Sequence, residues 1–157
     1  MKKLFALVFM LFSVNSFAAG ETTLKDIQFK DLNNNTVTLE QYQGKKLYVK
    51  MWASWCPICL AGLAEIDELS AEQNKDFNVI TIVSPGQKGE KSSDKFIEWY
   101  KGLEYKNIVV LLDEKGEALK RTKVRGYPSS LIVDQELNLQ KVIPGHLGTA
   151  QIKQAFN

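Results

Sequence analysis

The chain contains very little cysteine and histidine. Its 157 residues include two cysteines and one histidine. A structural zinc site takes four protein ligands, usually cysteine and histidine, so these three residues exclude one. A framework of several disulfides is excluded as well, because two cysteines form one bridge at most. The chemistry of the cysteines is therefore the chemistry of a single pair.

The sequence also lacks an excess of charge of either sign. Its formal net charge is +2 at pH 7, and Lys2 and Lys3 account for that surplus. Nucleic acids and anionic membrane surfaces select for basic faces, so neither is an expected partner. Internal repeats, low-complexity tracts and interdomain linkers are also missing. We expect a monomer that acts on other proteins.

Long apolar runs are missing too, and the one near the N-terminus is short. Two lysines come first, then the apolar run Leu4–Phe12, then Ser16-Phe17-Ala18, with small residues at −3 and −1 of a cleavage point. This order predicts a signal peptide over residues 1–18. Residues 19–157 would then be one domain, soluble in the periplasm or another extracytoplasmic space. The alternative is an uncleaved N-terminal membrane anchor, for which the run is rather short.

Apolar runs and turn residues predict alternating strands and helices along the rest of the chain. The first two strands form a hairpin around Asn33-Asn34-Asn35, and Thr149 is the expected N-cap of the last helix. This order predicts an α/β fold with a mixed central sheet flanked by helices. Strands are expected at 27–30, 36–39, 45–52, 78–83, 108–112, 130–133 and 139–143, and helices at 57–73, 94–102, 115–122 and 149–156.

Both cysteines lie where a predicted strand ends and a helix begins, in Trp52-Ala53-Ser54-Trp55-Cys56-Pro57-Ile58-Cys59. Cysteines three apart on a first helical turn share a face and can close a small ring. Such a ring constrains little of the unfolded chain, so redox chemistry is its expected role. Unpaired N–H groups and the helix dipole favour the thiolate at this point. Cys56 is therefore predicted to be the exposed nucleophile and Cys59 the buried resolving thiol, with Pro57 in the first helical turn.

This stretch resembles the active site of the thioredoxin superfamily, in its exported TlpA-type branch. In that family a cis X-Pro bond faces the dithiol, and the matching segment here is Val124-Arg125-Gly126-Tyr127-Pro128-Ser129. The resemblance implies that Trp55, Pro57, Tyr127 and Pro128 contact the substrate, with its peptide pairing along the backbone of Tyr127. It also implies a thioredoxin fold with an N-terminal hairpin and a helix–strand insertion before the cis-proline hairpin. The redox group would be the Cys56–Cys59 disulfide, with no other cofactor.

A second set of residues narrows the resemblance to one subgroup, the N-terminal thioredoxin-like domain of fused exported methionine sulfoxide reductases. That domain passes electrons from a membrane thiol carrier to the reductase domains. The resemblance therefore implies a free-standing reductant, with a membrane thiol carrier as electron source and oxidised methionine sulfoxide reductase as partner. The residues that carry it are Ser84-Pro85-Gly86, Glu90-Lys91, Phe96, Trp99-Tyr100, Gly102-Leu103 and Tyr105.

Two positions depart from the family pattern. Many TlpA-type proteins carry Glu three residues after the second cysteine, where this chain has Gly62, and cytoplasmic thioredoxins carry a buried Asp where it has Lys50. We expect Lys50 to lie beneath the dithiol, where it would lower the pKa of Cys56 or accept a proton. The alternatives are Glu65 in that role and Lys50 as an edge residue reaching water. His146 is interpreted as an ordinary surface or packing residue.

Several functions stay open from the sequence alone. Within the same enzyme class, a reductant for cytochrome c maturation and a disulfide-forming oxidase are alternatives, because Pro57-Ile58 does not decide the direction of electron flow. A copper chaperone of thioredoxin fold would use the two cysteines and His146. A non-catalytic binding module would carry the disulfide as an inert bridge.

Overall fold

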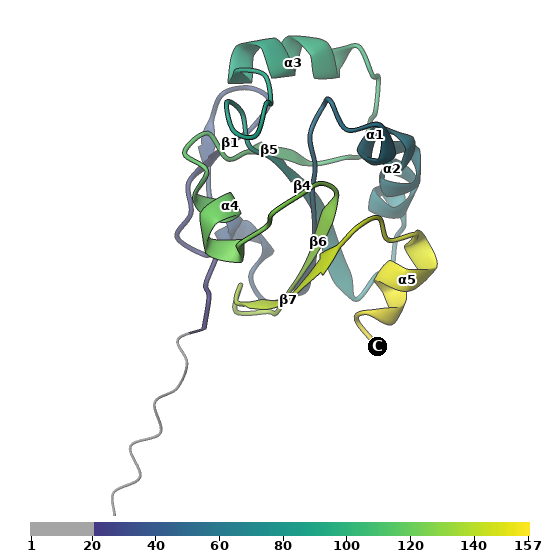
Figure 1. The fold of residues 1–157 in the computed structure, drawn as a ribbon. Coiled ribbons are helices and arrows are strands. Elements are labelled where there is room, and N and C mark those ends of the chain that lie inside the picture. Colours follow the sequence, from purple (N-terminus) through teal and green to yellow (C-terminus); the bar gives the residue numbers. More distant parts are fainter. Residues whose placement is uncertain (1–20) are drawn as a thin grey trace, which may run out of the picture.

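The structure, a computed structural model, describes residues 21–157, so the predicted signal peptide lies outside the described residues. Seven strands form one mixed sheet in the order β2-β1-β5-β4-β3-β6-β7 (Figure 1). The strands are β1 (Phe29–Lys30), β2 (Thr36–Val37), β3 (Lys46–Met51), β4 (Phe77–Val83), β5 (Val110–Leu112), β6 (Ser129–Val133) and β7 (Leu139–Pro144). The helices are a short 3-10 helix (Leu39–Tyr42), α1 (Pro57–Ala61), α2 (Leu63–Ala71), α3 (Ser93–Lys101), α4 (Glu117–Thr122) and α5 (Thr149–Gln154).

The centre of the sheet consists of strands that are buried on both faces. β3 is parallel to β4, and β4 is parallel to β5, so each needs a crossover helix, as the predicted βαβ unit requires. β6 pairs antiparallel with β3 on its other side, and β7 closes the edge. The α/β class, the mixed sheet and the helix–strand insertion before the cis-proline hairpin are confirmed.

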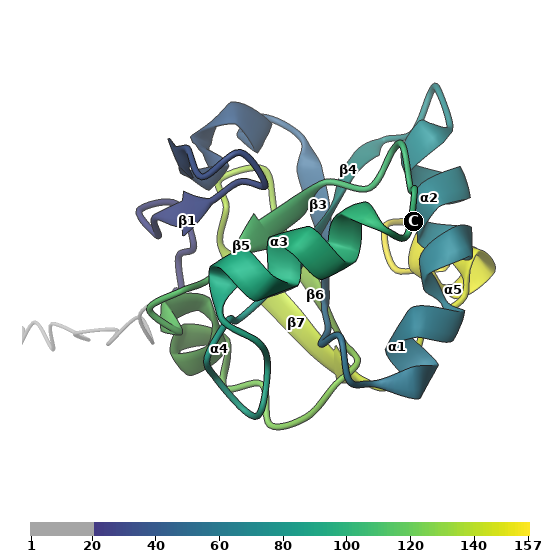
Figure 2. The same cartoon turned by 90° about the horizontal axis from the view of Figure 1, so that it is seen from above.

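Alternation along β3 divides the core between the two faces of the sheet. Leu47, Val49 and Met51 face one side, where they pack with the apolar residues of α4 and the N-terminal segment. Tyr48 faces the other side and packs with α2 and α5, and Trp52, just after β3, packs with α1 and α3. Figure 2 shows α1, α2 and α5 on one side of the strands and α4 on the other. Lys50 therefore belongs to the face covered by α1, α2 and α5.

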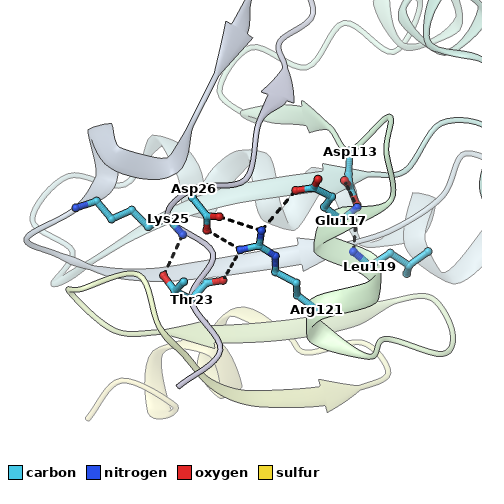
Figure 3. Close-up of polar contacts among 7 residues, drawn as sticks. All are labelled: Thr23, Lys25, Asp26, Asp113, Glu117, Leu119 and Arg121. Atoms are coloured by element: carbon cyan, nitrogen blue, oxygen red, sulfur yellow. Dashed lines mark hydrogen bonds and ion pairs between the residues drawn. The ribbon is translucent and has the colours of Figure 1, made fainter. Parts of the chain in front are cut away.

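The N-terminal segment is tied to α4 by Arg121 (Figure 3). Its guanidinium donates to both carboxylate oxygens of Asp26, at 2.5 and 3.0 Å, and to the carbonyl of Thr23 at 3.2 Å. Glu117, one turn earlier on α4, lies 3.6 Å from the same guanidinium. Asp113 accepts from the backbone N–H groups of Glu117 and Leu119 and so fixes the start of α4. These contacts make the described N-terminal stretch an integral part of the domain.

The predicted helix over 57–73 is wrong in one respect, because it is two helices. Gly62 separates α1 from α2, and its N–H bonds the carbonyls of Cys59 and Leu60. Glycine is a poor helix former, and at this point two side chains from other elements approach its backbone closely. Gly62 keeps helical dihedral angles, so α2 continues directly from α1.

Two smaller expectations also need correction. Thr149 is the first residue of α5 and not its N-cap, since Gly148 occupies that place and the Thr149 N–H bonds Glu65 of α2. The second hairpin strand ends at Val37, because Leu39 begins the 3-10 helix. The predicted turn is as expected, with Asn34 in the left-handed region at φ 65°.

Candidate active site

The two cysteines are joined by a disulfide at the end of β3, with their Cα atoms 5.2 Å apart. Cys56 is the N-cap of α1 and Pro57 its first residue, as predicted. The Cys59 N–H points at the Cys56 sulfur, 3.2 Å away. In the reduced protein this contact favours a Cys56 thiolate, and it carries more weight than the dipole of a five-residue helix.

Cys56 is more exposed than Cys59, as predicted, but Cys56 is itself largely buried and not an exposed residue. Cys56 is 4% exposed and Cys59 is fully buried. Both belong to a cluster with Trp52, Leu63 and Phe96, which leaves Cys56 with only a small exposed area. A partner must therefore bring its disulfide close to the protein surface around Cys56.

That surrounding surface is apolar and includes the predicted substrate contacts. The Tyr127–Pro128 bond is cis, as the resemblance implied. The rings of Trp55 and Tyr127 lie 6.1 Å apart, and Trp55 and Ile58 are 50% and 62% exposed. A groove runs beside them, with Ile58, Val124, Pro128, Val142 and His146 among its lining residues. Trp55, Tyr127 and Pro128 thus gather on one side of the disulfide, while Pro57 is exposed at the start of α1.

A buried carboxylate holds the loop before Cys56, and sequence reasoning gave it no role. Glu90 accepts from the Ser54 N–H at 2.5 Å and from the Ser54 hydroxyl at 2.6 Å. Lys91 donates to the same hydroxyl at 2.7 Å, and its ammonium lies 5.1 Å from the Trp99 ring centroid. Glu90, Lys91 and Trp99 all belong to the set that carried the subgroup resemblance. That resemblance therefore rests on residues that build the active-site loop.

An aromatic cluster supports the end of β3 from behind. Trp52 packs against Phe96, Trp99 and Tyr100 of α3, with ring centroids 5.7, 6.3 and 6.1 Å away. Such packing is rigid, because each ring fills a large volume with few rotatable bonds. The backbone that leads from Trp52 to Cys56 is therefore fixed by α3 as well as by Glu90.

Lys50 lies inside the protein beneath α1 and α2. It is 1% exposed, so the alternative of an edge lysine reaching water is wrong. Its Nζ has no hydrogen-bond partner in residues 21–157. Burial lowers the pKa of this amine from its ordinary 10.5 to about 8, and the nearby Glu65 carboxylate opposes that shift. A buried amine with such a pKa can exchange a proton near neutral pH.

Glu65 and His146 approach the same place from the solvent side. Glu65 Oε2 lies 3.5 Å from His146 Nε2, and its other oxygen accepts from the Thr149 N–H. The Thr149 N–H is the largest cause that lowers the pKa of Glu65, and His146 and Lys50 lower it further. His146, interpreted from the sequence as a surface or packing residue, is thus paired with a carboxylate from α2. No local pattern indicates this pair, because only the fold brings the loop after β7 beside α2.

Two further observations concern metal binding and membrane-spanning helices. Within residues 21–157, no three His, Cys, Asp or Glu side chains gather in a way that could hold a metal ion. None of the helices in that range is long and apolar enough to cross a membrane.

Comparison with known proteins identifies the family. The model of the Redoxin family matches residues 18–155. The chain belongs to the Redoxin family. An uncharacterized protein of Haemophilus influenzae is 66% identical over 153 residues, covering 98% of this chain and 97% of that one. The thiol-disulfide oxidoreductase ResA of Geobacillus thermodenitrificans is 25% identical over 143 residues, covering 91% and 79%.

Solved structures agree with this assignment. The exposed lipoprotein thioredoxin Etrx1 of Streptococcus pneumoniae superposes with a TM-score of 0.77 at 45% identity, covering 82% of this chain and 95% of that one. The N-terminal domain of PilB from Neisseria gonorrhoeae gives 0.73 at 31%, covering 80% and 83%. The chain is a thiol–disulfide oxidoreductase of thioredoxin fold, with Cys56 and Cys59 as its disulfide.

Proposed function

We propose that the Cys56–Cys59 pair works as a reductant outside the cytoplasm and that its partner is oxidised methionine sulfoxide reductase. The observation that carries the thiol–disulfide exchange is the asymmetry of the pair, and the reducing direction rests on the subgroup resemblance. The Cys56 sulfur is the one that receives an N–H, and Cys56 keeps a small exposed area, whereas Cys59 is fully buried. Cys56 is therefore placed to attack a partner, and Cys59 is placed to attack Cys56.

The reaction transfers two electrons to the partner in two exchanges. The Cys56 thiolate attacks one sulfur of the partner's disulfide, that bond breaks, and the partner's second sulfur leaves as a thiolate. Cys59 then loses its proton and attacks the Cys56 sulfur. The mixed disulfide breaks, the partner leaves as a dithiol, and the Cys56–Cys59 disulfide remains. Trp55, Pro57, Tyr127 and Pro128 would contact the partner while the mixed disulfide exists, and Lys50 would handle the proton of the second exchange.

The choice of partner rests on the residues that build the loop before Cys56. Glu90, Lys91 and Trp99 carried the resemblance to the thioredoxin-like domain of fused methionine sulfoxide reductases, and they hold Ser54 in place. Methionine sulfoxide reductase is a suitable substrate because its cycle ends in a disulfide that must be reduced. The similarity to the PilB N-terminal domain supports the same choice.

The electron source is proposed to be a membrane thiol carrier. Extracytoplasmic compartments are oxidising and supply no thiols of their own, so electrons must come through the membrane. The similarity to an exposed lipoprotein thioredoxin supports a location outside the cytoplasm. The Cys56–Cys59 disulfide would alternate between the two partners and would need no other cofactor.

Trapping with Cys59→Ser tests the direction and the partner together. Without its resolving thiol the protein should stop at the mixed disulfide and accumulate a higher-mass species that reductant removes. We expect methionine sulfoxide reductase and the membrane thiol carrier in that species, and far less trapping by Cys56→Ser. If the trapped species contained secreted proteins with many cysteines, the protein would be a disulfide-forming oxidase. If it contained cytochrome c maturation proteins, the protein would be a reductant for that process. A reduction potential near −270 mV supports the reductant, and one near −120 mV contradicts it.

A further inference from the structure

Gly62 provides the space in which two titratable side chains, Lys50 and His146, come close together. A Cβ atom at this position would lie 2.8 Å from Lys50 Nζ and 2.8 Å from His146 Cε1. Carbon atoms do not approach other heavy atoms so closely, so any larger residue would displace the lysine, the histidine or both. Gly62 follows Cys59 by three residues, which places it on the same side of the helical turn. The amine and the imidazole thus face each other across a glycine beside the resolving thiol.

The two nitrogens of the His146 imidazole lie toward different residues, Gly62 and Glu65. Its Nδ1 is the nitrogen near Gly62, 3.0 Å from the position of the missing Cβ. Its Nε2 lies 3.5 Å from Glu65 on the other side. An imidazole with two differently placed nitrogens can receive a proton at one and release it at the other. This orientation is the one that a proton relay from Lys50 toward Glu65 requires.

The exposed fraction increases from Lys50 to His146 and Glu65. The Lys50 amine has almost no contact with solvent, whereas the side chains of His146 and Glu65 are 33% and 39% exposed. A proton that reaches the amine therefore has a way out through His146 and Glu65. The other titratable groups on this side of β3 are Lys46, whose ammonium donates to the Phe156 carbonyl, and Tyr48, which is bonded to Ser130 and whose pKa burial raises to about 12. Tyr48 stays neutral and takes no part in proton exchange near neutral pH.

His146 also lines the groove beside Pro128. A partner seated in that groove would lie against one side of the imidazole, while Glu65 and the space over Gly62 lie on others. His146 therefore belongs both to the exposed pair with Glu65 and to the groove in which a partner would bind.

We propose that Lys50, His146 and Glu65 form a proton path from Cys59 to the partner groove, an inference that rests on the proposed function. In the second exchange the Cys59 thiol gives its proton to the neutral amine of Lys50, and the resulting thiolate attacks Cys56. The ammonium passes the proton to His146 Nδ1, and the proton at Nε2 leaves to Glu65 and solvent. The departing partner thiolate can take up a proton at the same opening. Gly62 is part of the path because any larger residue there would displace the amine or the imidazole.

The second exchange can be measured alone with an aromatic disulfide, 5,5′-dithiobis(2-nitrobenzoate), as the probe. The reduced protein releases one coloured thiolate when Cys56 attacks and a second when Cys59 resolves the adduct. Loss of an acid–base group lowers such rates by about 100-fold or more, so we expect at least a tenfold slower second release at pH 7 in Lys50→Met and His146→Gln. The deficit should shrink toward pH 10, where hydroxide deprotonates Cys59 directly. The double variant should be no slower than the slower single one, because both belong to one path.

Glu68→Gln is the control. It removes an exposed carboxylate from α2, the helix that carries Glu65, at a position outside the proposed path. It should resolve the adduct at the rate of the unmodified protein at every pH. Unchanged second release in both Lys50→Met and His146→Gln would overturn the path, as would a loss confined to Lys50→Met. A merely structural role would slow both releases equally and at every pH, which would also overturn it. Failure of the proposed function is recognised separately, since Cys59→Ser would then trap no methionine sulfoxide reductase.

Discussion

At the scale of single residues, the unusual feature of this protein is a lysine buried beneath a redox-active pair. An amine without a hydrogen-bond partner is unfavourable in a protein interior when it is charged. Its lowered pKa expresses the same effect, because burial favours the neutral form. Folding and function therefore place opposite demands on Lys50, which is the pattern expected where a group is kept for chemistry and not for stability.

Lys50→Met should stabilise the oxidised protein at neutral pH and not at high pH. The folded pKa of about 8 lies below the ordinary 10.5, so between these values the unfolded chain binds more protons than the folded one. The unmodified protein therefore gains stability as pH rises through this window, by about 3 kcal/mol at most. Urea unfolding at pH 7 and pH 10.5 should show the variant more stable at the lower pH, with the difference closing at the higher. An equal difference in unfolding free energy at both pH values would show that burial does not lower the pKa of Lys50 in the folded protein.

At the scale of elements, the active site depends on how a strand, two short helices and two loops meet. The Cys56–Cys59 pair and the cis Tyr127–Pro128 bond could be predicted from the sequence, because each belongs to a short motif beside a strand that the family resemblance matches. The strands β3, β4, β6 and β7 were placed within about one residue, because short runs of apolar residues bounded by turn residues mark them. The break at Gly62 was missed because the apolar period continues through it. The pairing of Glu65 with His146 depends on tertiary contacts that no local pattern records.

Gly62→Ala should destabilise the protein although alanine is the better helix former. In an open helical position the exchange would stabilise by up to about 1 kcal/mol. Here the added methyl group would meet Lys50 and His146 at 2.8 Å, so we expect a net loss of about 1–3 kcal/mol in unfolding free energy. Gly126→Ala is the control, because a Cβ at Gly126 meets nothing within 4 Å. In a Lys50→Ala background the loss should become smaller, and a loss of the same size there would contradict the crowding by Lys50.

At the scale of the whole molecule, the fold places its chemistry at one end of the sheet and its partner surface around it. α1 and the loop before β6 meet at the end of β3, so the disulfide and the cis-proline loop face the same side. The large hydrophobic side chains that remain exposed in the described residues, Trp55 and Ile58, flank the disulfide. Exposed apolar groups that gather around a reactive centre mark a surface used for association. Stability comes from the three core clusters, and none of them includes these two residues.

Trp55→Ala should therefore separate partner recognition from folding and from thiol chemistry. The Trp55 ring packs against Tyr127 alone among the aromatic rings of residues 21–157, so its loss should change the unfolding free energy by less than about 0.5 kcal/mol. An exposed aromatic anchor at the centre of an interface contributes about 2 kcal/mol, which corresponds to a loss of about 30-fold in kcat/KM with a protein partner. Reaction with a small aromatic disulfide should keep its rate, because that probe needs only the Cys56 sulfur. Lys141→Ala, an exposed change on β7, serves as the control and should alter neither reaction. Equal losses with the protein and the small disulfide would mean that Trp55 acts on the thiol itself and not on the partner.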